Sequence, residues 1–383
     1  MIYFDSAATT LQKPDAVSKA VGRAVRELAS PGRGGHRPSM MAADTAYLCR
    51  EAAAALFSVP EPERVVFTHN ATQALNMAIK SIVTAGDRVV ISGYEHNSVL
   101  RPLYATRAEV QVAQSALFCP RSAVRAFDAA ICADTKLVVL NHVSNAFGFI
   151  LPAAEIAALC RARGVPLIID ASQSAGVLDI DAAALGADFI AMPGHKGLYG
   201  PQGTGILLCK APPAGTLLEG GTGSDSRSRE MPELLPDRLE AGTHNMPGIS
   251  GLLEGIRFVK RRETARILRH ERKLLRRLTE GLQSISGVET YAAADEACQA
   301  GVLSFRLEGL DCETLAEALG ARGVAVRAGL HCAPLAHRSA GTSQTGTVRV
   351  SFSAFNTERE AARFLCILEH TGKKLRKQER NLP

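Results

Sequence analysis

Short runs of apolar residues alternate with longer helical patterns between residues 64 and 209. The apolar runs, rich in Val, Ile and Leu, are typical of strands buried on both faces of a sheet. They read RVVFT, DRVVISG, KLVVLNHV, VPLIIDA, DFIAM and TGILLC. Segments between them, such as ATQALNMAIKSIVTAG and LPAAEIAALCRARG, are apolar at helical spacing and close with glycine. This alternation predicts an α/β fold with a doubly wound, mainly parallel sheet.

The pattern changes after about residue 250. A basic amphipathic helix is predicted over about 251–284, and short strands (VLSFRL, VAVRAG, TVRVSFS) and helices (CETLAEALGARG, EREAARFLCILEHTG) follow it. The sequence therefore predicts a large domain over residues 11–250. A smaller α+β domain would take residues 251–383, together with the N-terminal segment 1–10.

Composition narrows the class of protein. The chain has 383 residues, of which 46% are hydrophobic and 21% charged, as in ordinary globular enzymes. Its nine cysteines form no CxxC pair, which argues against a disulfide framework or a metal site and predicts a reducing compartment. The N-terminus MIYFDSAATT lacks a signal-peptide pattern, and the uncharged run LVVLNHVSNAFGFILPAA carries Asn, His and Pro. We expect a cytoplasmic protein with no membrane span.

The net charge of +6 is unevenly distributed. Residues 257–277 contain ten Lys and Arg against two Glu, and residues 373–380 contain five against one. The ordinary interpretation is a solvated helix face and a frayed tail. The alternative is a docking surface for an acidic protein or RNA. No aromatic residues lie among these bases, and single-stranded nucleic-acid grooves use aromatics for stacking, so we expect no nucleic-acid partner.

Candidate functional residues follow the predicted strands, where open α/β sheets bind ligands. Ala71 and Thr72 begin a helix after the first strand, and backbone N–H groups at such a start can hold an anion. The later strands are followed by His96, by Asn145, by Asp170 and Gln173, and by His195 and Lys196. Each has an ordinary alternative: Thr72 as a helix cap, His96 as a core or surface histidine, Asp170 as a turn cap, and Lys196 as an exposed lysine.

Taken together, these residues match what pyridoxal 5'-phosphate requires. Its phosphate needs a helix N-terminus, and its pyridine nitrogen needs a carboxylate such as Asp170 to stay protonated. Its aldehyde needs a lysine of lowered pKa such as Lys196, and a ring such as that of His96 can hold its plane. The set therefore predicts a pyridoxal-phosphate enzyme.

The motifs resemble one known family over nearly the whole chain. They are FDSAATT, THNATQALN, EHNSVLRP, NHVSNAFG, IDASQS, GHKGLYGPQGTG, LEAGTHN, RAGLHC and RVSFSAFNT. Their order and spacing resemble class V aminotransferase-fold enzymes, and among these the cysteine desulfurase and selenocysteine lyase group. The resemblance implies the pyridoxal-phosphate-dependent transferase fold-type I and a homodimer.

The resemblance also implies a role for each matching residue. Lys196 would carry the cofactor as a Schiff base, Asp170 would pair with its ring nitrogen, and His96 would stack on the ring and could move protons. The other implied contacts are Gln173 with the ring hydroxyl; Ala71, Thr72, His195 and Thr243 of the other subunit with the phosphate; Asn145 and Arg349 with the substrate carboxylate; and His36 and Arg327 lining the site. The role of Arg349 in binding the substrate carboxylate is also supported by physical chemistry, because a guanidinium can hold a carboxylate through two parallel hydrogen bonds.

Two positions depart from the family pattern. Many relatives have a serine three positions before the Schiff-base lysine, where this chain has Pro193. An additional glycine, Gly197, follows Lys196 before LYGP. Both departures bear on how the phosphate is held.

Cys332 is the candidate nucleophile. It lies in RAGLHC, 17 positions before Arg349, which resembles the short-loop branch of the desulfurases. The implied reaction removes the Cα proton of L-cysteine through Lys196, and Cys332 then attacks the substrate sulfur to give alanine and a persulfide. His331 and Arg327, with the cofactor, would favour the thiolate form of Cys332. The alternative is a passive loop thiol, while the other eight cysteines mostly lie in apolar patterns and are expected in the core.

Several functional alternatives stay open at this point. Selenocysteine lyase is the nearest, and an aminotransferase or kynureninase-like activity is less favoured. The persulfide needs an acceptor, so we expect a sulfur-acceptor protein, for instance in iron–sulfur cluster assembly. The basic segment 257–277 is a candidate docking surface for it.

Overall fold

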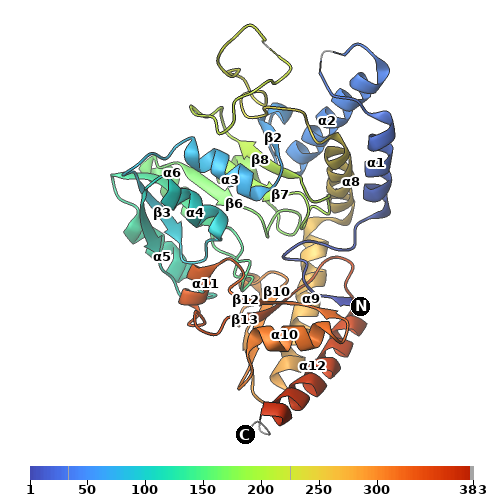
Figure 1. Cartoon of the computed structure of the whole chain (residues 1–383). Helices are drawn as coiled ribbons and strands as arrows, with labels where there is room; N and C mark the ends of the chain where they lie inside the picture. Colours follow the sequence, from blue (N-terminus) through green and yellow to red (C-terminus); the bar gives the residue numbers. More distant parts are fainter. Residues whose placement is uncertain (33, 225, 380–383) are drawn as a thin grey trace.

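The computed structural model describes residues 1–32, 34–224 and 226–379. Figure 1 shows a large part built on a seven-stranded sheet and a smaller part below it built on a four-stranded sheet. The N-terminus and the last helix, α12 (Glu358–Glu379), lie at the smaller part.

The large sheet has the strand order β2-β8-β7-β6-β5-β3-β4. Its strands are β2 (Val65–Thr68), β3 (Arg88–Ser92), β4 (Glu109–Ala113), β5 (Thr135–Asn141), β6 (Leu167–Asp170), β7 (Phe189–Pro193) and β8 (Gly205–Cys209). The pairs from β7 to β4 are parallel, whereas β8 is antiparallel to both β7 and β2. The α/β fold with a mainly parallel sheet is thus confirmed, and β8 is its antiparallel exception.

Helices cover both faces of this sheet, which explains its continuously apolar strands. Successive side chains of β3 point into hydrophobic cores on opposite faces of the sheet. Val89 and Ile91 lie in the first core, and Val90 lies in the second. The first core is covered by α3 (Ala71–Lys80) and α4 (Asn97–Ala105). The second is covered by α2 (Arg37–Leu56), α5 (Pro120–Ala130), α6 (Ala153–Arg163) and α8 (Met246–Arg262). The short α7 (Ala182–Leu185) follows β6 along the chain.

The prediction of one continuous basic helix over about 251–284 is wrong, because the structure has two helices in this region. α8 ends at Arg262 and α9 (Thr264–Gln283) begins after Glu263, whose φ of 65° lies outside the helical region. α8 packs on α1 (Asp15–Glu27) and α2, while α9 packs on α12 (Glu358–Glu379). Most apolar residues of α8 pack in the core of the large part and those of α9 in the core of the smaller part, while Phe258, Val259 and Ile267 form a cluster where the two helices meet. A continuous periodic pattern does not reveal this change of core. The domain division between residues 250 and 251 stays a prediction, and α8 runs across it.

The smaller sheet is antiparallel, with the order β12-β13-β10-β9. Its strands are β9 (Val288–Tyr291), β10 (Val302–Leu307), β12 (Arg327–Gly329) and β13 (Thr347–Ser351), with α10 (Cys312–Gly320) and α11 (Pro334–Ser339) between them. The expected strand VAVRAG is divided, because its first half, β11 (Val324–Ala325), pairs instead with β1 (Ile2–Tyr3). This pairing ties the N-terminal segment to the smaller part.

No helix in the ranges that the structure describes is long and apolar enough to cross a membrane.

The turn at Gly176 offers a stability test next to the site. Gly176 has φ +82°, and a Cβ there would lie 2.1 Å from the carbonyl oxygen of Gly197, directly after Lys196. Gly176→Ala should therefore lower the free energy of unfolding by about 3 kcal/mol, through backbone strain plus overpacking. Gly309→Ala is the matched control, since Gly309 has φ +75° with nothing within 4 Å and should cost only about 1 kcal/mol. Urea denaturation measures both, and equal losses would contradict the close-contact argument.

Candidate active site

One cleft collects most of the residues that follow the strands. The space that it encloses, part of it open to solvent, is about 470 Å³. Of the predicted residues it is lined by Ala71, Thr72, His96, Asn145, Asp170, Gln173, His195 and Lys196. Asn70, Ser98, Asn141, Ser172 and Pro193 complete the lining. The carboxyl ends of β3, β5, β6 and β7 supply this cleft because parallel strands end at the same sheet edge.

Lys196 lies in the turn after β7, and its ammonium group is destabilised there. Burial lowers the pKa of Lys196 to about 8, and the nearby charge of Arg349 adds to this, while Asp170 acts in the opposite direction. An amine of that pKa is partly neutral near pH 8 and can attack an aldehyde.

The pH dependence of cofactor capture tests this environment. With a pKa of about 8, the neutral fraction of Lys196 rises from about a tenth at pH 7 to about nine-tenths at pH 9. The rate at which apoprotein captures pyridoxal phosphate should therefore rise about tenfold over that interval and then level off. Stopped-flow absorbance measures the rate, with Nα-acetyl-lysine as the model amine. A rate that keeps climbing beyond pH 10, as for an ordinary lysine, would contradict the lowered pKa.

Asp170 supplies the buried carboxylate of the cleft. It is 2% exposed at the end of β6, and its Oδ1 accepts the Ser172 N–H at 2.9 Å. Gln173 follows in the same turn, and its Nε2 donates to the carbonyl oxygen of Ala7 at 2.9 Å. The N-terminal segment thereby holds the turn that presents both side chains.

His96 stands directly before α4 and is held in one orientation. Its Nδ1 accepts the Ser98 N–H at 3.1 Å, so the neutral ring carries its proton on Nε2. Burial lowers the pKa of His96, with Asp170 opposing the shift and Lys196 adding to it. A neutral, oriented ring is suited to stacking on a flat ligand.

The start of α3 lines the part of the cleft where an anion could bind. Asn70 caps this helix by accepting the Gln73 N–H at 2.9 Å, so Thr72 is not the cap and its exposed side chain is left for another partner. His195 lies nearby, and burial lowers its pKa to about 4; its Nδ1 is buried without a hydrogen-bond partner among the described residues. Backbone N–H groups, a hydroxyl and an imidazole are the donors that a phosphate would use.

The two departures from the family pattern have structural counterparts. Pro193 ends β7 and lines the cleft, where it offers neither a hydroxyl nor an N–H group. A Cβ at Gly197 would lie 2.3 Å from the carbonyl oxygen of Ala175, so only glycine fits against that turn. Gly197 therefore permits the close contact between the lysine turn and the turn at residues 175–177.

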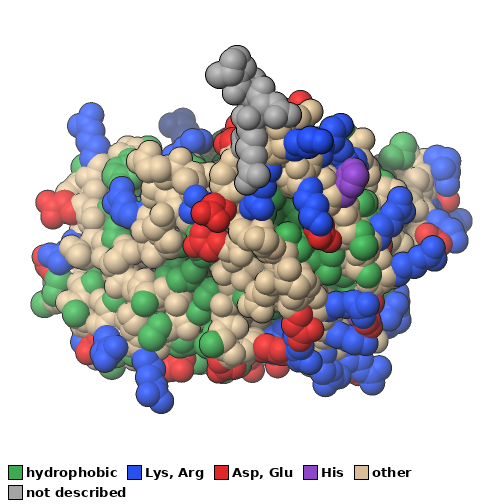
Figure 2. All heavy atoms as spheres, turned by 90° about the horizontal axis from the view of Figure 1, so that it is seen from below, with side chains coloured by type: hydrophobic (Ala, Val, Ile, Leu, Met, Phe, Trp, Pro, Cys, Tyr) green, Lys and Arg blue, Asp and Glu red, His purple; other side chains and the backbone are tan. Residues whose placement is uncertain are grey.

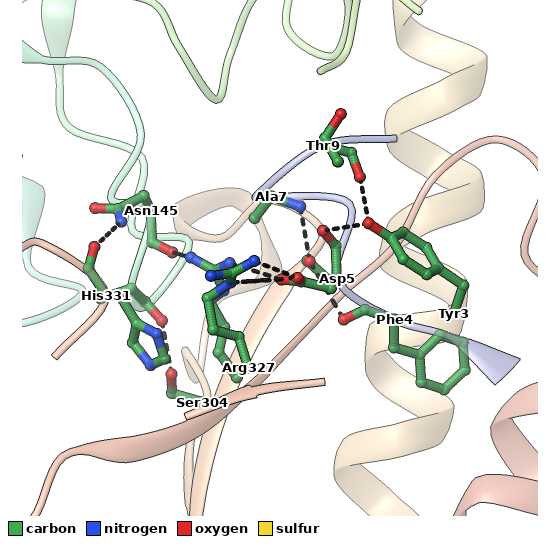
Figure 3. A network of polar contacts seen from close by, with 12 residues as sticks. Tyr3, Phe4, Asp5, Ala7, Thr9, Asn145, Ser304, Arg327 and His331 are labelled. Carbon is green, nitrogen blue, oxygen red and sulfur yellow. Dashed lines mark hydrogen bonds and ion pairs between the residues drawn. The ribbon is translucent and has the colours of Figure 1, made fainter. Parts of the chain in front are cut away.

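Asp5 joins two arginines beside the cleft. Nη2 of Arg349 lies 3.0 Å from Oδ1 of Asp5, and Nη2 of Arg327 lies 2.8 Å from Oδ2. Figure 3 shows Asp5 facing the guanidinium of Arg327, with Asn145 and His331 on the opposite side. Nη1 of Arg349 donates to the backbone oxygen of Asn145 at 2.8 Å. Arg349 does not itself line the cleft, but it is bonded to Asn145, which does.

The loop of Cys332 is fastened to the same region. His331 and Cys332 have φ values of 52° and 55°, an arrangement that non-glycine residues adopt only when their surroundings impose it. The carbonyl oxygen of His331 accepts from Asn145 Nδ2 at 2.7 Å, and that of Cys332 accepts the Asn97 N–H at 2.8 Å. Asn97 is the first residue of α4, next to His96, so the backbone of the exposed residue Cys332 lies beside the element that carries His96 of the cleft.

His331 cannot supply the positive charge expected beside Cys332. Burial lowers the pKa of His331 to about 2, and the charge of Arg349 acts in the same direction. The ring is therefore neutral at pH 7, and its Nε2 lies 3.1 Å from the hydroxyl of Thr347. Among the predicted sources of charge near the loop, Arg327 remains.

Two predicted residues are not brought to the cleft within one chain. His36 is exposed at the start of α2, and Thr243 lines cavities formed with residues 203–205 and with α2. For Thr243 this agrees with the expectation that it acts in the other subunit's site, which stays a prediction.

Sequence reasoning missed two acidic residues. Asp5 stands in the quoted motif FDSAATT, but its partners lie more than 300 positions away. Glu95 is fully buried, and burial raises its pKa to about 8; its Oε1 accepts from Ser92 Oγ at 2.5 Å and from the Asn141 N–H at 2.7 Å. The sequence signal for Glu95 was its position directly before His96 in the motif EHNSVLRP.

All nine cysteines are free thiols. Cys49, Cys160, Cys209 and Cys312 are buried as expected, whereas Cys366 on α12 is exposed and Cys119, Cys132 and Cys298 are partly exposed. Helical periodicity did not reveal that Cys366 faces solvent.

Unpartnered buried atoms indicate that the region is built around a ligand. Asn145 Oδ1, His195 Nδ1 and Arg349 Nε are buried with no hydrogen-bond partner among the described residues. Unpaired buried polar groups are costly unless a ligand completes them. A phosphate seat, an oriented ring, a carboxylate, an amine of lowered pKa and a carboxylate clamp together fit pyridoxal phosphate and an amino acid. Within the described parts of the chain, no group of three or more His, Cys, Asp or Glu could hold a metal ion.

Comparisons with known proteins agree with this chemistry. The family model for aminotransferase class-V matches residues 2–364. A probable cysteine desulfurase of Pyrococcus abyssi is 33% identical over 396 aligned residues, covering 99% of this chain and 96% of the relative. A probable cysteine desulfurase of Xylella fastidiosa is 35% identical, covering 96% and 90%. The solved structure of a cysteine desulfurase from Thermococcus onnurineus superposes with a TM-score of 0.87 at 33% identity, covering 97% of this chain and 95% of that one.

Proposed function

The chain belongs to the aminotransferase class-V family, and we propose that it is a cysteine desulfurase that uses pyridoxal phosphate to convert L-cysteine to L-alanine. The sulfur would pass to Cys332 as a persulfide. The observation that carries the proposal is the hydrogen bond from the Asn97 N–H to the Cys332 carbonyl, which ties the backbone of Cys332 to the residue that follows His96 of the cleft. The relatives are named cysteine desulfurases, which gives the selenocysteine lyase alternative no separate support.

The cleft residues have separate tasks in this proposal. The cofactor, when bound to Lys196, supplies an acceptor for the electrons released when the substrate Cα proton leaves. Asp170 would keep the ring nitrogen protonated, Gln173 would contact the ring hydroxyl, and His96 would lie against the ring face. Ala71, Thr72 and His195 would hold the phosphate at the start of α3. Lys196, whose pKa is about 8, would take the Cα proton.

The substrate carboxylate would bind Arg349 and Asn145, with Arg327 at the rim. This places the substrate sulfur toward the loop of Cys332. The thiolate of Cys332 then attacks that sulfur: an S–S bond forms and the Cβ–S bond breaks. The electron pair of the broken bond stays with carbon, Cβ takes up a proton to become the methyl group of alanine, and a proton returned to Cα completes the product.

A second copy of the chain would complete the site. Support comes from apolar side chains that are exposed on α1, α2 and the segment 215–240, namely Val25, Met40, Tyr47, Leu48, Leu218 and Leu234. These elements lie together at the top of Figure 1, and Thr243 belongs to the same region. We propose a homodimer through this face, with Thr243 and His36 serving the partner's cleft.

A sulfur acceptor and a cytoplasmic location are part of the proposal. The exposed free thiols Cys332 and Cys366 suit a reducing compartment. The basic segment 257–277 is weak as a docking surface because several of its bases are already paired: Arg276 with Glu296, and Lys273 and Arg277 with Glu358. Figure 2, which views the molecule from below Figure 1, shows Lys and Arg gathered toward the right side of that view, with Asp and Glu among them.

Alanine release from L-cysteine tests the activity directly. The purified holoenzyme, supplied with L-cysteine and a thiol reductant, should release alanine and sulfide in equal amounts. L-Serine is the control substrate, because it has the same amine and carboxylate but no sulfur to transfer, and it should yield no alanine. A holoenzyme that releases no alanine from L-cysteine would refute the proposed function.

A further inference from the structure

The contact between Asp5 and Arg349 bears on substrate affinity, an inference that rests on the proposed function. Arg349 is 2% exposed and Asp5 is 8% exposed, so this pair is removed from solvent. A buried guanidinium needs a counter-ion, and Asp5 is the acid that it contacts. The arginine proposed to hold the substrate carboxylate is therefore already paired with a carboxylate of the chain.

The atoms involved show why the two carboxylates compete. A carboxylate binds the side of a guanidinium through two parallel donors, Nε and Nη2. In Arg349 Nε is buried without a partner, while Nη2 donates to Asp5 at 3.0 Å. The third nitrogen, Nη1, donates to the Asn145 carbonyl. Because Nη2 carries two N–H donors, a substrate carboxylate that engages both side donors would share Nη2 with Asp5, and the two negative charges would compete for the one positive charge of Arg349.

Arg327 gives Asp5 a second partner. Its Nη2 lies 2.8 Å from Oδ2 of Asp5, its Nε lies 3.2 Å from both carboxylate oxygens, and its side chain is 51% exposed. Asp5 can thus give up Arg349 and keep an ion pair with Arg327. The three side chains together carry one net positive charge, which one α-carboxylate would neutralise.

We propose that Asp5 is a resident competitor of the substrate: it pairs with Nη2 of Arg349 in the empty site and opposes the binding of the α-carboxylate there, while Arg327 remains an ion-pair partner of Asp5. Asp5 thereby weakens the binding of every amino acid that uses the clamp. It also keeps Arg349 paired and oriented when no substrate is present.

Titration of the holoenzyme with L-alanine, followed by the visible absorbance of the cofactor, measures the competition without turnover. Asp5→Asn removes the competing charge and should lower the dissociation constant of L-alanine about tenfold. L-Alaninamide lacks the carboxylate and should bind wild type and variant alike. Asp134→Asn, which removes an exposed carboxylate elsewhere, should leave both constants unchanged. An unchanged or raised dissociation constant for L-alanine in Asp5→Asn would overturn the proposal.

Arg327→Gln supplies a second test should Asp5→Asn fail to fold. Without Arg327, Arg349 is the remaining ion-pair partner of Asp5, so Asp5 should compete more strongly with the substrate carboxylate. The dissociation constant of L-alanine should therefore rise about fivefold. In the Asp5→Asn background the same change should have little effect, because Arg327 then has no competitor to restrain. A constant that falls or stays unchanged in Arg327→Gln overturns the proposal, as does an equal rise in both backgrounds.

These results are separable from the desulfurase activity. L-Alanine binding does not depend on sulfur transfer, so the competition can be found in a protein that releases no alanine from L-cysteine. Competition in a protein that releases no alanine would contradict the proposed function and support the role of Asp5. A wild-type holoenzyme that L-alanine does not perturb would instead overturn the role of Asp5.

Discussion

Cys332→Ala should abolish alanine formation from L-cysteine, with a loss of at least about 10³-fold in kcat. The reason is chemical: without the thiol there is no acceptor for the substrate sulfur, while the cleft that binds cofactor and substrate is intact. The exposed loop position of Cys332 means that the change should leave the fold and the cofactor spectrum unaltered. Alanine released per unit time is measured beside the absorbance of the bound cofactor.

Cys366→Ala is the matched control, because Cys366 is the other exposed thiol and lies on α12. It should retain full activity. Equal alanine release by wild type and Cys332→Ala would show that the sulfur leaves by another route and that the thiol is a bystander. Activity of Cys332→Ala on L-selenocysteine alone would show that both substrates fit one site, since a selenol leaves more readily than a thiol.

Lys196→Ala should eliminate both covalent cofactor binding and turnover, again by at least about 10³-fold. The amine of Lys196 is the cleft group whose pKa of about 8 suits it to join an aldehyde and to move a proton near neutral pH. The expected result is a protein that binds pyridoxal phosphate reversibly, loses it on dialysis, and releases no alanine. Lys196→Arg should fail equally, because charge without a nucleophilic amine does not restore the reaction.

Lys80→Ala is the control for this pair, since Lys80 is exposed in the last turn of α3. It should keep both the dialysis-resistant cofactor and the activity. A Lys196→Ala protein that still retained the cofactor through dialysis and still released alanine would assign the Schiff base to another lysine.

The sequence alone determined the fold class, the family and the cofactor class. Fully buried strands must be apolar throughout, and parallel strands need helices between them, so the alternation from residue 64 to 209 carries the topology. Ligand-binding residues follow strand ends for a topological reason, which is why His96, Asp170 and Lys196 could be named from their order along the chain.

The tertiary structure decided how distant residues combine. Asp5 meets Arg327 and Arg349 across more than 300 positions, and no local pattern encodes that ion pair. The break at Glu263 separates α8 from α9, most of whose apolar residues pack in different cores, although their basic pattern is continuous. The neutrality of His331 arises from burial, which sequence neighbours do not reveal. Local propensity and periodicity are written in adjacent residues, whereas desolvation and long-range pairing exist only once the chain has packed.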